Sequence, residues 1–367
     1  MMIRSIQYFL LVAQLFLSGT ALSGPATRRT SIVTGANGYL GKEIIHELLE
    51  QESSDQIICL VRPARIDSET KYWQSQSTAG KNLIQILPYD MLDGGDTLQS
   101  ALEQVDGPCC VYHVASNFGP TENHEQTALD NVQGTEDLIR TVAKCAPASS
   151  RVVLTSSMAA VRGTGQDPIN GKFYTSQDWN TVSELGANWG ASYQWSKAES
   201  ERRAIALAET LGLELVTLCP SFVFGPPREL ESTSSYSLTL VGQWARGESQ
   251  VQSRLFVDVR DVATAHVTAG TKPDMGGKRL IISTQARVSS KEIASWLMKV
   301  CEETGKGDAG KIHYDAEFTG GAIAIGEKEV EAEQILQEEL GITLKSVKDT
   351  IVGMATTLLS EETKQIQ

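Results

Sequence analysis

The stretch Thr34-Gly35-Ala36-Asn37-Gly38-Tyr39-Leu40-Gly41 decides the fold expected for this chain. It follows a β-branched run and precedes an amphipathic segment at residues 42–49, whose apolar residues recur at helical spacing. A glycine loop between strand and helix is typical of a dinucleotide site, because the helix N-terminus attracts a pyrophosphate. There Gly35 would allow the tight turn, Gly38 the close approach of phosphate, and Gly41 the packing of helix on strand. The alternative is a glycine-rich loop without a ligand.

Short apolar runs alternate with longer amphipathic stretches along the first two-thirds of the chain. Strands that are apolar throughout and separated by helices are typical of a parallel sheet covered on both faces. The sequence therefore predicts an α/β fold with a Rossmann-type doubly wound parallel sheet. The predicted strands cover residues 31–34, 57–61, 83–87, 110–114, 152–154 and 215–218.

The pattern changes after Pro220 toward loops and helices. The prolines at 226–227 and the serine-rich residues 231–237 predict a loop, and Gly341 predicts the end of a late helix. We expect a smaller, mostly helical C-terminal substrate lobe that closes over the carboxyl edge of the sheet. The helices predicted here cover residues 238–246, 289–300 and 329–340.

The expected division places a Rossmann domain at residues 28–225 and the substrate lobe at residues 226–367. The two units are expected to be partly interleaved, because residues 256–263 look like a further return to the sheet.

Composition and charge exclude several classes of protein. The chain has 367 residues and a net charge of -13, with no Lys/Arg-rich run, so a nucleic-acid partner is not expected. The six cysteines are widely scattered, and no Cys/His cluster suggests a metal site. We interpret all six cysteines as structural, mainly as small core residues.

Residues 1–23 form a distinct leader in which Arg4 precedes an apolar run and Ala21 and Ser23 precede Gly24. This layout predicts a cleaved signal peptide. An uncleaved membrane anchor, an organelle-targeting leader and an incorrect start of the gene model are the alternatives. Membrane association is expected only through this leader. A functional leader would place the protein in the secretory pathway or endomembranes, and without one the protein would be cytoplasmic.

The residue after the second strand distinguishes between dinucleotides. Arg62 lies there, and a guanidinium suits the 2′-phosphate of NADP, whereas NAD favours an acid at this place. A solvated surface arginine is the alternative. Asp90 and Met91 follow the third strand, where an adenine amino group could be bound.

Tyr193 and Lys197 stand four residues apart at the start of a long predicted helix, so they share one face. A free tyrosine has a pKa of about 10, and a nearby ammonium would lower it. This spacing alone is common in helices that have no catalytic role. Ser156 and Ser157 follow the fifth strand, where the carboxyl edge of the sheet faces the ligand crevice. Together these residues predict a carbonyl-reduction site.

The chain at this point resembles the extended short-chain dehydrogenase/reductases, also described as the NAD-dependent epimerase/dehydratase superfamily. It is most similar to the dihydroflavonol reductase, cinnamoyl-CoA reductase and yeast-type carbonyl (methylglyoxal) reductase branch. The motifs that carry the resemblance are TGANGYLG at 34–41, VR at 61–62, VYHVAS at 111–116, NVQGTEDLI at 131–139, LTSSMAAV at 154–161, YQWSKAESE at 193–201, LCPSFVFGP at 218–226 and FVDVRDVATAH at 256–266.

The resemblance implies that Ser157, Tyr193 and Lys197 form the catalytic triad, with Ser156 the less favoured serine. It also implies that Arg62 contacts the 2′-phosphate. The cofactor contacts expected in all are Gly35, Asn37, Gly38, Tyr39, Leu40, Gly41, Arg62, Asp90, Met91, Val114, Ala115, Ser116, Tyr193, Lys197, Pro220 and Val223.

The leading hypothesis is an NADPH-dependent reductase of an aldehyde or ketone, with Tyr193 as acid/base. A nucleotide-sugar epimerase or dehydratase with retained NAD and a non-catalytic NADP-binding protein are the alternatives. The substrate does not transfer from the family, because residues 162–189 match no specificity pattern. The sequence leaves the oligomeric state open.

Overall fold

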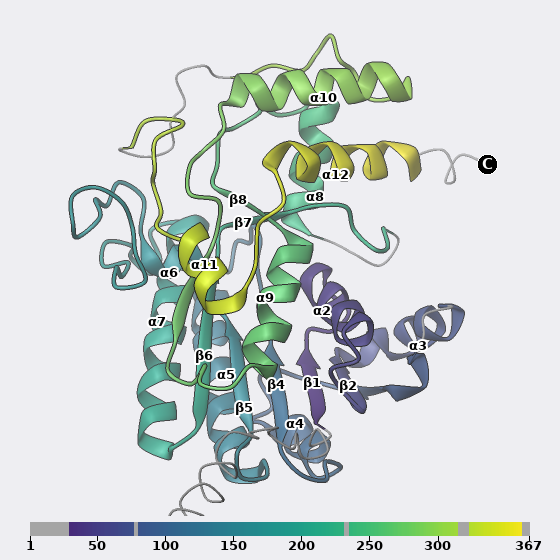
Figure 1. Cartoon of the computed structure of the whole chain (residues 1–367), viewed down its shortest axis with the longest axis vertical. Coiled ribbons are helices and arrows are strands. Elements are labelled where there is room, and N and C mark those ends of the chain that lie inside the picture. Colours follow the sequence, from purple (N-terminus) through teal and green to yellow (C-terminus); the bar gives the residue numbers. More distant parts are fainter. Residues whose placement is uncertain (1–28, 77–79, 231–234, 315–322, 362–367) are drawn as a thin grey trace, which may run out of the picture.

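The computed structural model describes residues 29–76, 80–230, 235–314 and 323–361 (Figure 1). The predicted leader and residues 231–234 of the serine-rich stretch lie outside the described residues. No helix within the described ranges is both long and apolar enough to cross a membrane.

Seven parallel strands form the central sheet, in the order β3-β2-β1-β4-β5-β6-β9 (Figure 1). The six predicted strands are present, and β9, a short strand that the sequence did not reveal, pairs with β6. The order reverses between β1 and β4, which opens a crevice at the carboxyl ends of the strands. The predicted Rossmann-type doubly wound sheet is therefore confirmed. The strands are β1 Thr30–Thr34, β2 Gln56–Val61, β3 Ile84–Pro88, β4 Cys109–His113, β5 Arg151–Thr155, β6 Glu214–Pro220 and β9 Arg279–Ile282.

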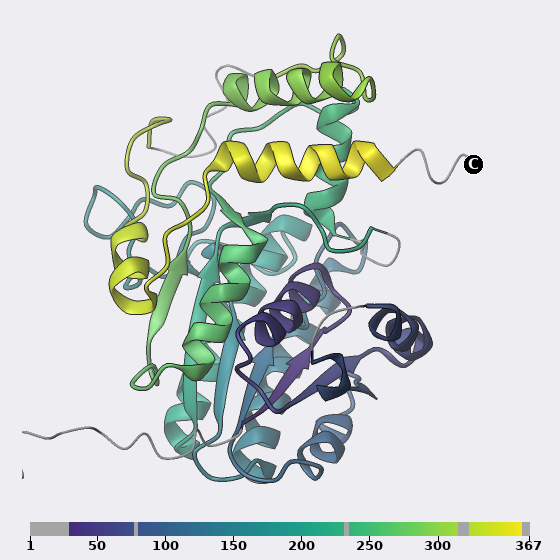
Figure 2. The same cartoon turned by 45° about the vertical axis from the view of Figure 1, so that its right-hand side comes forward.

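Helices cover both faces of this sheet, because alternate strand residues are apolar on opposite sides. Val33 of β1 packs in one core with α2 and α9, and its neighbour Ile32 packs in a second core with α4, α5 and α7. Figure 2 shows α2 and α9 side by side on the first face. The helical segments of this part are α2 Tyr39–Glu50, η1 Pro63–Arg65, α3 Ile66–Ser75, η2 Lys81–Leu83, α4 Asp96–Leu102, α5 His124–Cys145, α6 Met158–Val161, α7 Trp189–Leu211 and α9 Val259–Thr271.

A third apolar core forms the C-terminal lobe, which consists of α8, α10, α12 and the two-stranded parallel sheet of β7 and β8. Phe224 of β7 and Phe256 of β8 lie with their ring centroids 4.9 Å apart, and Trp244 of α8 packs on Phe224. The elements of this lobe are β7 Phe222–Phe224, α8 Tyr236–Ala245, β8 Phe256–Asp258, α10 Ser290–Thr304 and α12 Val347–Glu361, and α11 Glu333–Leu340 packs instead in the first core.

Two expectations for this half of the chain are wrong in part. Residues 256–263 do not return to the central sheet, because β8 pairs with β7 and α9 begins at Val259. The Asp258 side chain accepts the Arg260 N–H at 2.9 Å and so starts the helix. The helix expected at 329–340 begins only at Glu333, since backbone pairing with Tyr174 holds residues 329–331 extended. The division at residue 225 stays a prediction.

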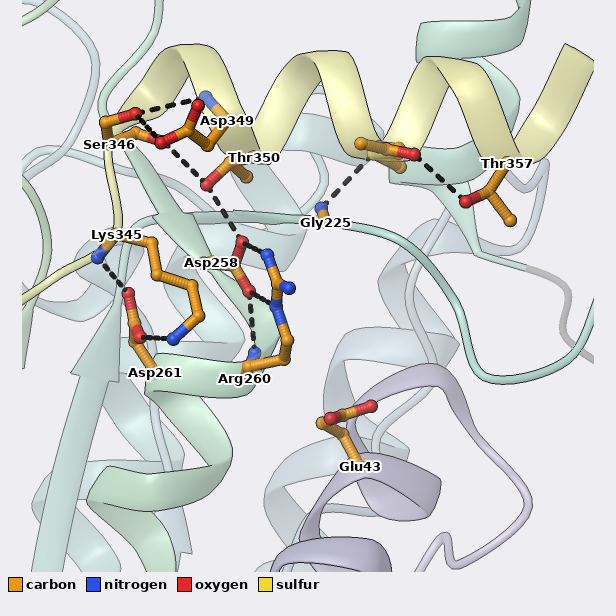
Figure 3. A network of polar contacts seen from close by, with 12 residues as sticks. Glu43, Gly225, Asp258, Arg260, Asp261, Lys345, Ser346, Asp349, Thr350 and Thr357 are labelled. Carbon is orange, nitrogen blue, oxygen red and sulfur yellow. Dashed lines mark hydrogen bonds and ion pairs between the residues drawn. The ribbon is translucent and has the colours of Figure 1, made fainter.

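A polar network joins α12 to the start of α9, and Figure 3 shows it from close by. Buried Asp258 accepts the Thr350 hydroxyl at 2.9 Å and the Arg260 guanidinium at 2.6 Å. The amide of Gly225 lies 3.3 Å from the Met354 sulfur of α12, and the Gly225 carbonyl accepts the Tyr39 phenol at 2.6 Å. The C-terminal helix therefore supports the glycine loop through Gly225.

Candidate active site

The glycine loop connects β1 to α2 with two positions that only glycine fits. Gly35 has a φ of +65°, and a Cβ there would lie 3.0 Å from the backbone of Ala115. A Cβ on Gly41 would lie 2.2 Å from the Gly35 carbonyl oxygen. Gly38 precedes α2 as its N-cap residue and donates its N–H to the Gly35 carbonyl at 2.9 Å. Asn37, just before this cap, and Leu40, in the first turn of α2, are half-buried. The loop forms the close cradle expected from the sequence.

A hydroxyl ties the ends of β1 and β4 together. Thr34 Oγ1 accepts the backbone N–H groups of Val114 and Ala115, both at 3.1 Å. Its proton is therefore donated to His113 Nδ1, 2.9 Å away. The sequence analysis missed Thr34 and His113, although a polar residue at the last position of each of two adjacent parallel strands was a usable signal.

Asn131 of α5 is a second organising residue that the sequence analysis missed. It is buried, its side-chain oxygen accepts the Asn117 N–H at 2.8 Å, and its amide donates to the Asn117 carbonyl at 2.9 Å. The Ser116 hydroxyl lies 3.4 Å from the same oxygen. This amide fixes the backbone just after β4, where three cofactor contacts are expected.

The residues expected around the adenosine end lie after β2 and β3. Arg62 is exposed at the start of η1. Asp90 is exposed too, and its carboxylate accepts the Leu92 N–H at 2.9 Å. Met91 packs against Gly134, where a Cβ would lie 2.2 Å from the methionine Cγ. The strand order places these residues on the opposite side of β1 from β5.

Ser157, Tyr193 and Lys197 come together at the carboxyl end of β5. Ser157 is the N-cap residue of α6, and its hydroxyl is close enough to the Tyr193 phenol to lower the pKa of that phenol. Lys197 Nζ donates to the Thr155 carbonyl at 3.2 Å. The neighbouring Ser156 is buried and donates instead to Glu201 at 2.8 Å. Of the two serines, Ser157 is the one that contacts the tyrosine.

Burial controls the ionisation of this group. It raises the pKa of the Tyr193 phenol to about 12, and the hydrogen bond with Ser157 lowers it only in part. It also lowers the pKa of Lys197 to about 8, against the opposing effect of the Glu201 carboxylate. The sequence-based expectation that the ammonium would depress the tyrosine pKa is thus wrong for this structure. The ammonium bonds to a carbonyl, and the loss of water disfavours the phenolate.

A small pocket joins the two halves of the site. His113 and Ala115 line it from the β4 side, and Lys197 and Ser156 line it from the β5 side. Pro220 ends β6 and is buried, and half-buried Val223 lies in β7. The predicted residues therefore lie along the carboxyl edge of the sheet, with Arg62, Asp90 and Met91 at its β2–β3 side.

Aromatic side chains surround Tyr193, and the sequence analysis did not identify them. The Phe118 ring lies 4.5 Å from the Tyr193 ring, centroid to centroid, and is 44% exposed. Trp189 and Tyr236 lie 6.1 Å and 5.6 Å from Phe118, and Phe222 extends the cluster. These residues come from three elements and one loop, so only the fold brings them together.

The cysteines and metal-ligand residues show no second centre within the described residues. All six cysteines are free, and five of them are buried. No group of three His, Cys, Asp or Glu side chains in these ranges could hold a metal ion.

A doubly wound sheet with a glycine loop at its switch point defines a Rossmann-type nucleotide-binding protein. The sequence pattern of the NAD dependent epimerase/dehydratase family matches residues 31–283. The chain belongs to this family, and the resemblance proposed from its motifs is confirmed.

The most similar proteins include reductases from plants. The chain is 30% identical over 267 residues to tetraketide alpha-pyrone reductase 2 of Arabidopsis thaliana, covering 70% of this chain and 79% of that protein. It is 31% identical over 260 residues to cinnamoyl-CoA reductase 1 of the same plant, covering 69% and 70%. The yeast methylglyoxal/isovaleraldehyde reductase Gre2, solved with NADPH, has a TM-score of 0.74 at 24% identity, covering 91% of this chain and 99% of that structure. This last likeness shows the fold alone.

Proposed function

We propose that this protein is an NADPH-dependent oxidoreductase that reduces the carbonyl group of an aldehyde or ketone. The observation that carries the proposal is the meeting of Ser157, Tyr193 and Lys197 at the sheet edge that also bears the glycine loop. The names of its relatives describe reductases, which supports reduction over epimerisation.

The residues present fit a dinucleotide. The cradle at Gly35 and Gly41 admits no Cβ, so the backbone can approach a pyrophosphate there. The exposed guanidinium of Arg62 would hold the 2′-phosphate through paired donors. When bound, the cofactor supplies the hydride to the carbonyl carbon. The residues around Ala115, Pro220 and Val223 would line its path to the triad.

Tyr193 would donate the proton that the carbonyl oxygen gains, and the Ser157 hydroxyl would hold that oxygen by a hydrogen bond. Because burial raises the pKa of Tyr193 to about 12, the phenol is protonated near neutral pH and ready to act as the acid. Lys197, in its ammonium form, would hold the ribose hydroxyls of the cofactor beside Tyr193. The aromatic cluster around Phe118 would form the wall of the substrate pocket.

The first test follows NADPH absorbance with the full chain and a panel of aldehydes, diketones and flavonoid-like ketones. We expect turnover in the wild type and a loss of at least about 100-fold in kcat for Tyr193→Phe, because the proton donor is removed. Tyr314→Phe, a half-buried tyrosine of the C-terminal lobe, serves as the control.

NADPH that binds but is not consumed with any carbonyl would contradict the proposal. Release of tightly held NAD on denaturation of the purified protein would instead support an epimerase or dehydratase.

A further inference from the structure

Glu201 is a fully buried carboxylate on α7, one helical turn beyond Lys197. Arg279 of β9 donates two hydrogen bonds to it, from Nε at 2.9 Å and from Nη2 at 3.1 Å. Ser156 donates a third at 2.8 Å. A buried carboxylate is stable only when its oxygens are paired in this way. The Cys219 sulfur of β6 lies 3.5 Å away, so three elements and the loop after β5 contribute to or border this one group.

Arg279 is anchored by two backbone carbonyls and a tryptophan ring. Its Nη1 donates to the carbonyls of Ser176 and Asp178, both at 2.7 Å, and its guanidinium lies 3.8 Å from the Trp179 ring centroid. Arg279 does not line the small pocket, whereas Glu201 and Lys197 both do. Of this ion pair, the carboxylate is therefore the member that borders the pocket together with the lysine.

The other titratable groups around Lys197 are neutral. Burial lowers the pKa of His113 on β4 to about 3, and it raises the pKa of the Cys219 thiol on β6. The Tyr193 phenol is protonated for the same reason. On β5, Thr155 offers only its carbonyl. Among the described groups facing the lysine, Glu201 is the source of negative charge.

We propose that Glu201 is a positioning residue that keeps Lys197 in its ammonium form and, through Ser156, fixes the strand end that carries Ser157. Its carboxylate offsets the cost of removing the ammonium from water. The consequence for catalysis rests on the proposed function, because that reaction needs the charged lysine beside the tyrosine. The charge effect itself is a property of the chain and needs no substrate.

The direct test is Glu201→Gln in the full chain, read by ¹³C NMR of labelled lysine Cε atoms. Lys197→Met assigns the Lys197 signal. The glutamine keeps the shape and an acceptor oxygen but removes the charge. We expect the Lys197 signal to titrate at a pH lower by about one unit, which is a tenfold change in the ratio of ammonium to amine. The alkaline limb of the kcat profile should move in the same direction.

The matched control is Glu199→Gln, the same change on the same helix, where Glu199 pairs with Arg203 at the surface. It should leave the Lys197 titration in place. Because Glu201→Gln strands a buried guanidinium, the double variant Glu201→Gln/Arg279→Gln is made as well, which removes both charges together. The double variant should be more stable than Glu201→Gln alone, and its Lys197 signal should still titrate at the lower pH.

A wild-type titration of Lys197 in both Glu201 variants would overturn the proposal, because the side chain would then have a structural role only. These outcomes are independent of the proposed function. If Tyr193→Phe retained turnover, the reductase mechanism would fail while the lysine titration still tested Glu201.

Discussion

The chemistry available to single residues at this site is determined by their loss of water. Tyr193 and Lys197 both move toward their neutral forms, since burial raises the pKa of the first and lowers that of the second. Hydrogen bonds determine which atoms face the pocket. The Thr34 hydroxyl forms a hydrogen bond with His113. Ser156 donates its hydroxyl to Glu201, and the neighbouring Ser157 contacts the tyrosine.

Arg62→Ala tests the cofactor choice at the residue scale. We expect the preference for NADPH over NADH in kcat/KM to fall about tenfold to a hundredfold, the effect of losing charge-assisted hydrogen bonds to the 2′-phosphate. Arg140→Ala, an exposed arginine of α5, controls for the general loss of positive charge. An unchanged preference would show that Arg62 is a solvated surface residue.

At the scale of elements, α12 is linked to the glycine loop through Gly225 and Tyr39. Thr350 donates to Asp258 at the start of α9 (Figure 3). Met354 contacts the amide of Gly225, and the Gly225 carbonyl accepts the Tyr39 phenol. Lys345, just before α12, donates to Asp261 through both its backbone and its side chain. The C-terminal helix thus supports the loop where the cofactor is expected.

Thr350→Val removes one hydrogen bond from this network and keeps the shape of the side chain. Because Thr350 is 1% exposed, we expect a loss of about 1–2 kcal/mol in the free energy of unfolding, measured by urea denaturation. Thr357→Val is the matched control on the same helix, since Thr357 is half-buried and bonds only its own helix at Gly353. Equal effects of the two variants would contradict a special role for Thr350.

Across the whole molecule, three buried histidines make stability depend on pH. Burial lowers the pKa of His46 to about 4, of His113 to about 3 and of His266 to about 4. A depressed histidine pKa means that the unfolded chain binds more protons, so stability is full above about pH 6.5 and falls below it.

We expect each of these histidines to lower the free energy of unfolding by about 2 kcal/mol between pH 7 and pH 5. Buried Glu43 and Glu69, whose pKa values burial raises, oppose the trend at the acid end. Urea denaturation across this range measures the slope. His46→Gln should reduce it, whereas exposed His313→Gln should not. A flat profile would contradict the prediction.

Local patterns carried most of the architecture. Six strands, the glycine loop and the end of α11 at Gly341 follow from apolar runs and turn residues, because these depend on neighbours in the sequence. The strand β9 and the extended residues 329–331 could not be predicted from local patterns. Their backbone conformation depends on pairing with distant partners, on β6 and at Tyr174. Val259 and Val262 are compatible with either a strand or a helix. The Asp258 side chain caps the helix N-terminus there, and these residues are helical.

By itself, the sequence determined the Rossmann-type fold, the family and the residues proposed for catalysis, because each rests on short motifs at fixed spacing. Only the tertiary structure decided the electrostatic environment of those residues. The Glu201–Arg279 pair, the Thr34–His113 bond and the aromatic cluster at Phe118 join groups far apart in the chain. The same burial reversed the expected shift of the Tyr193 pKa, since the water that a side chain loses depends on the whole fold.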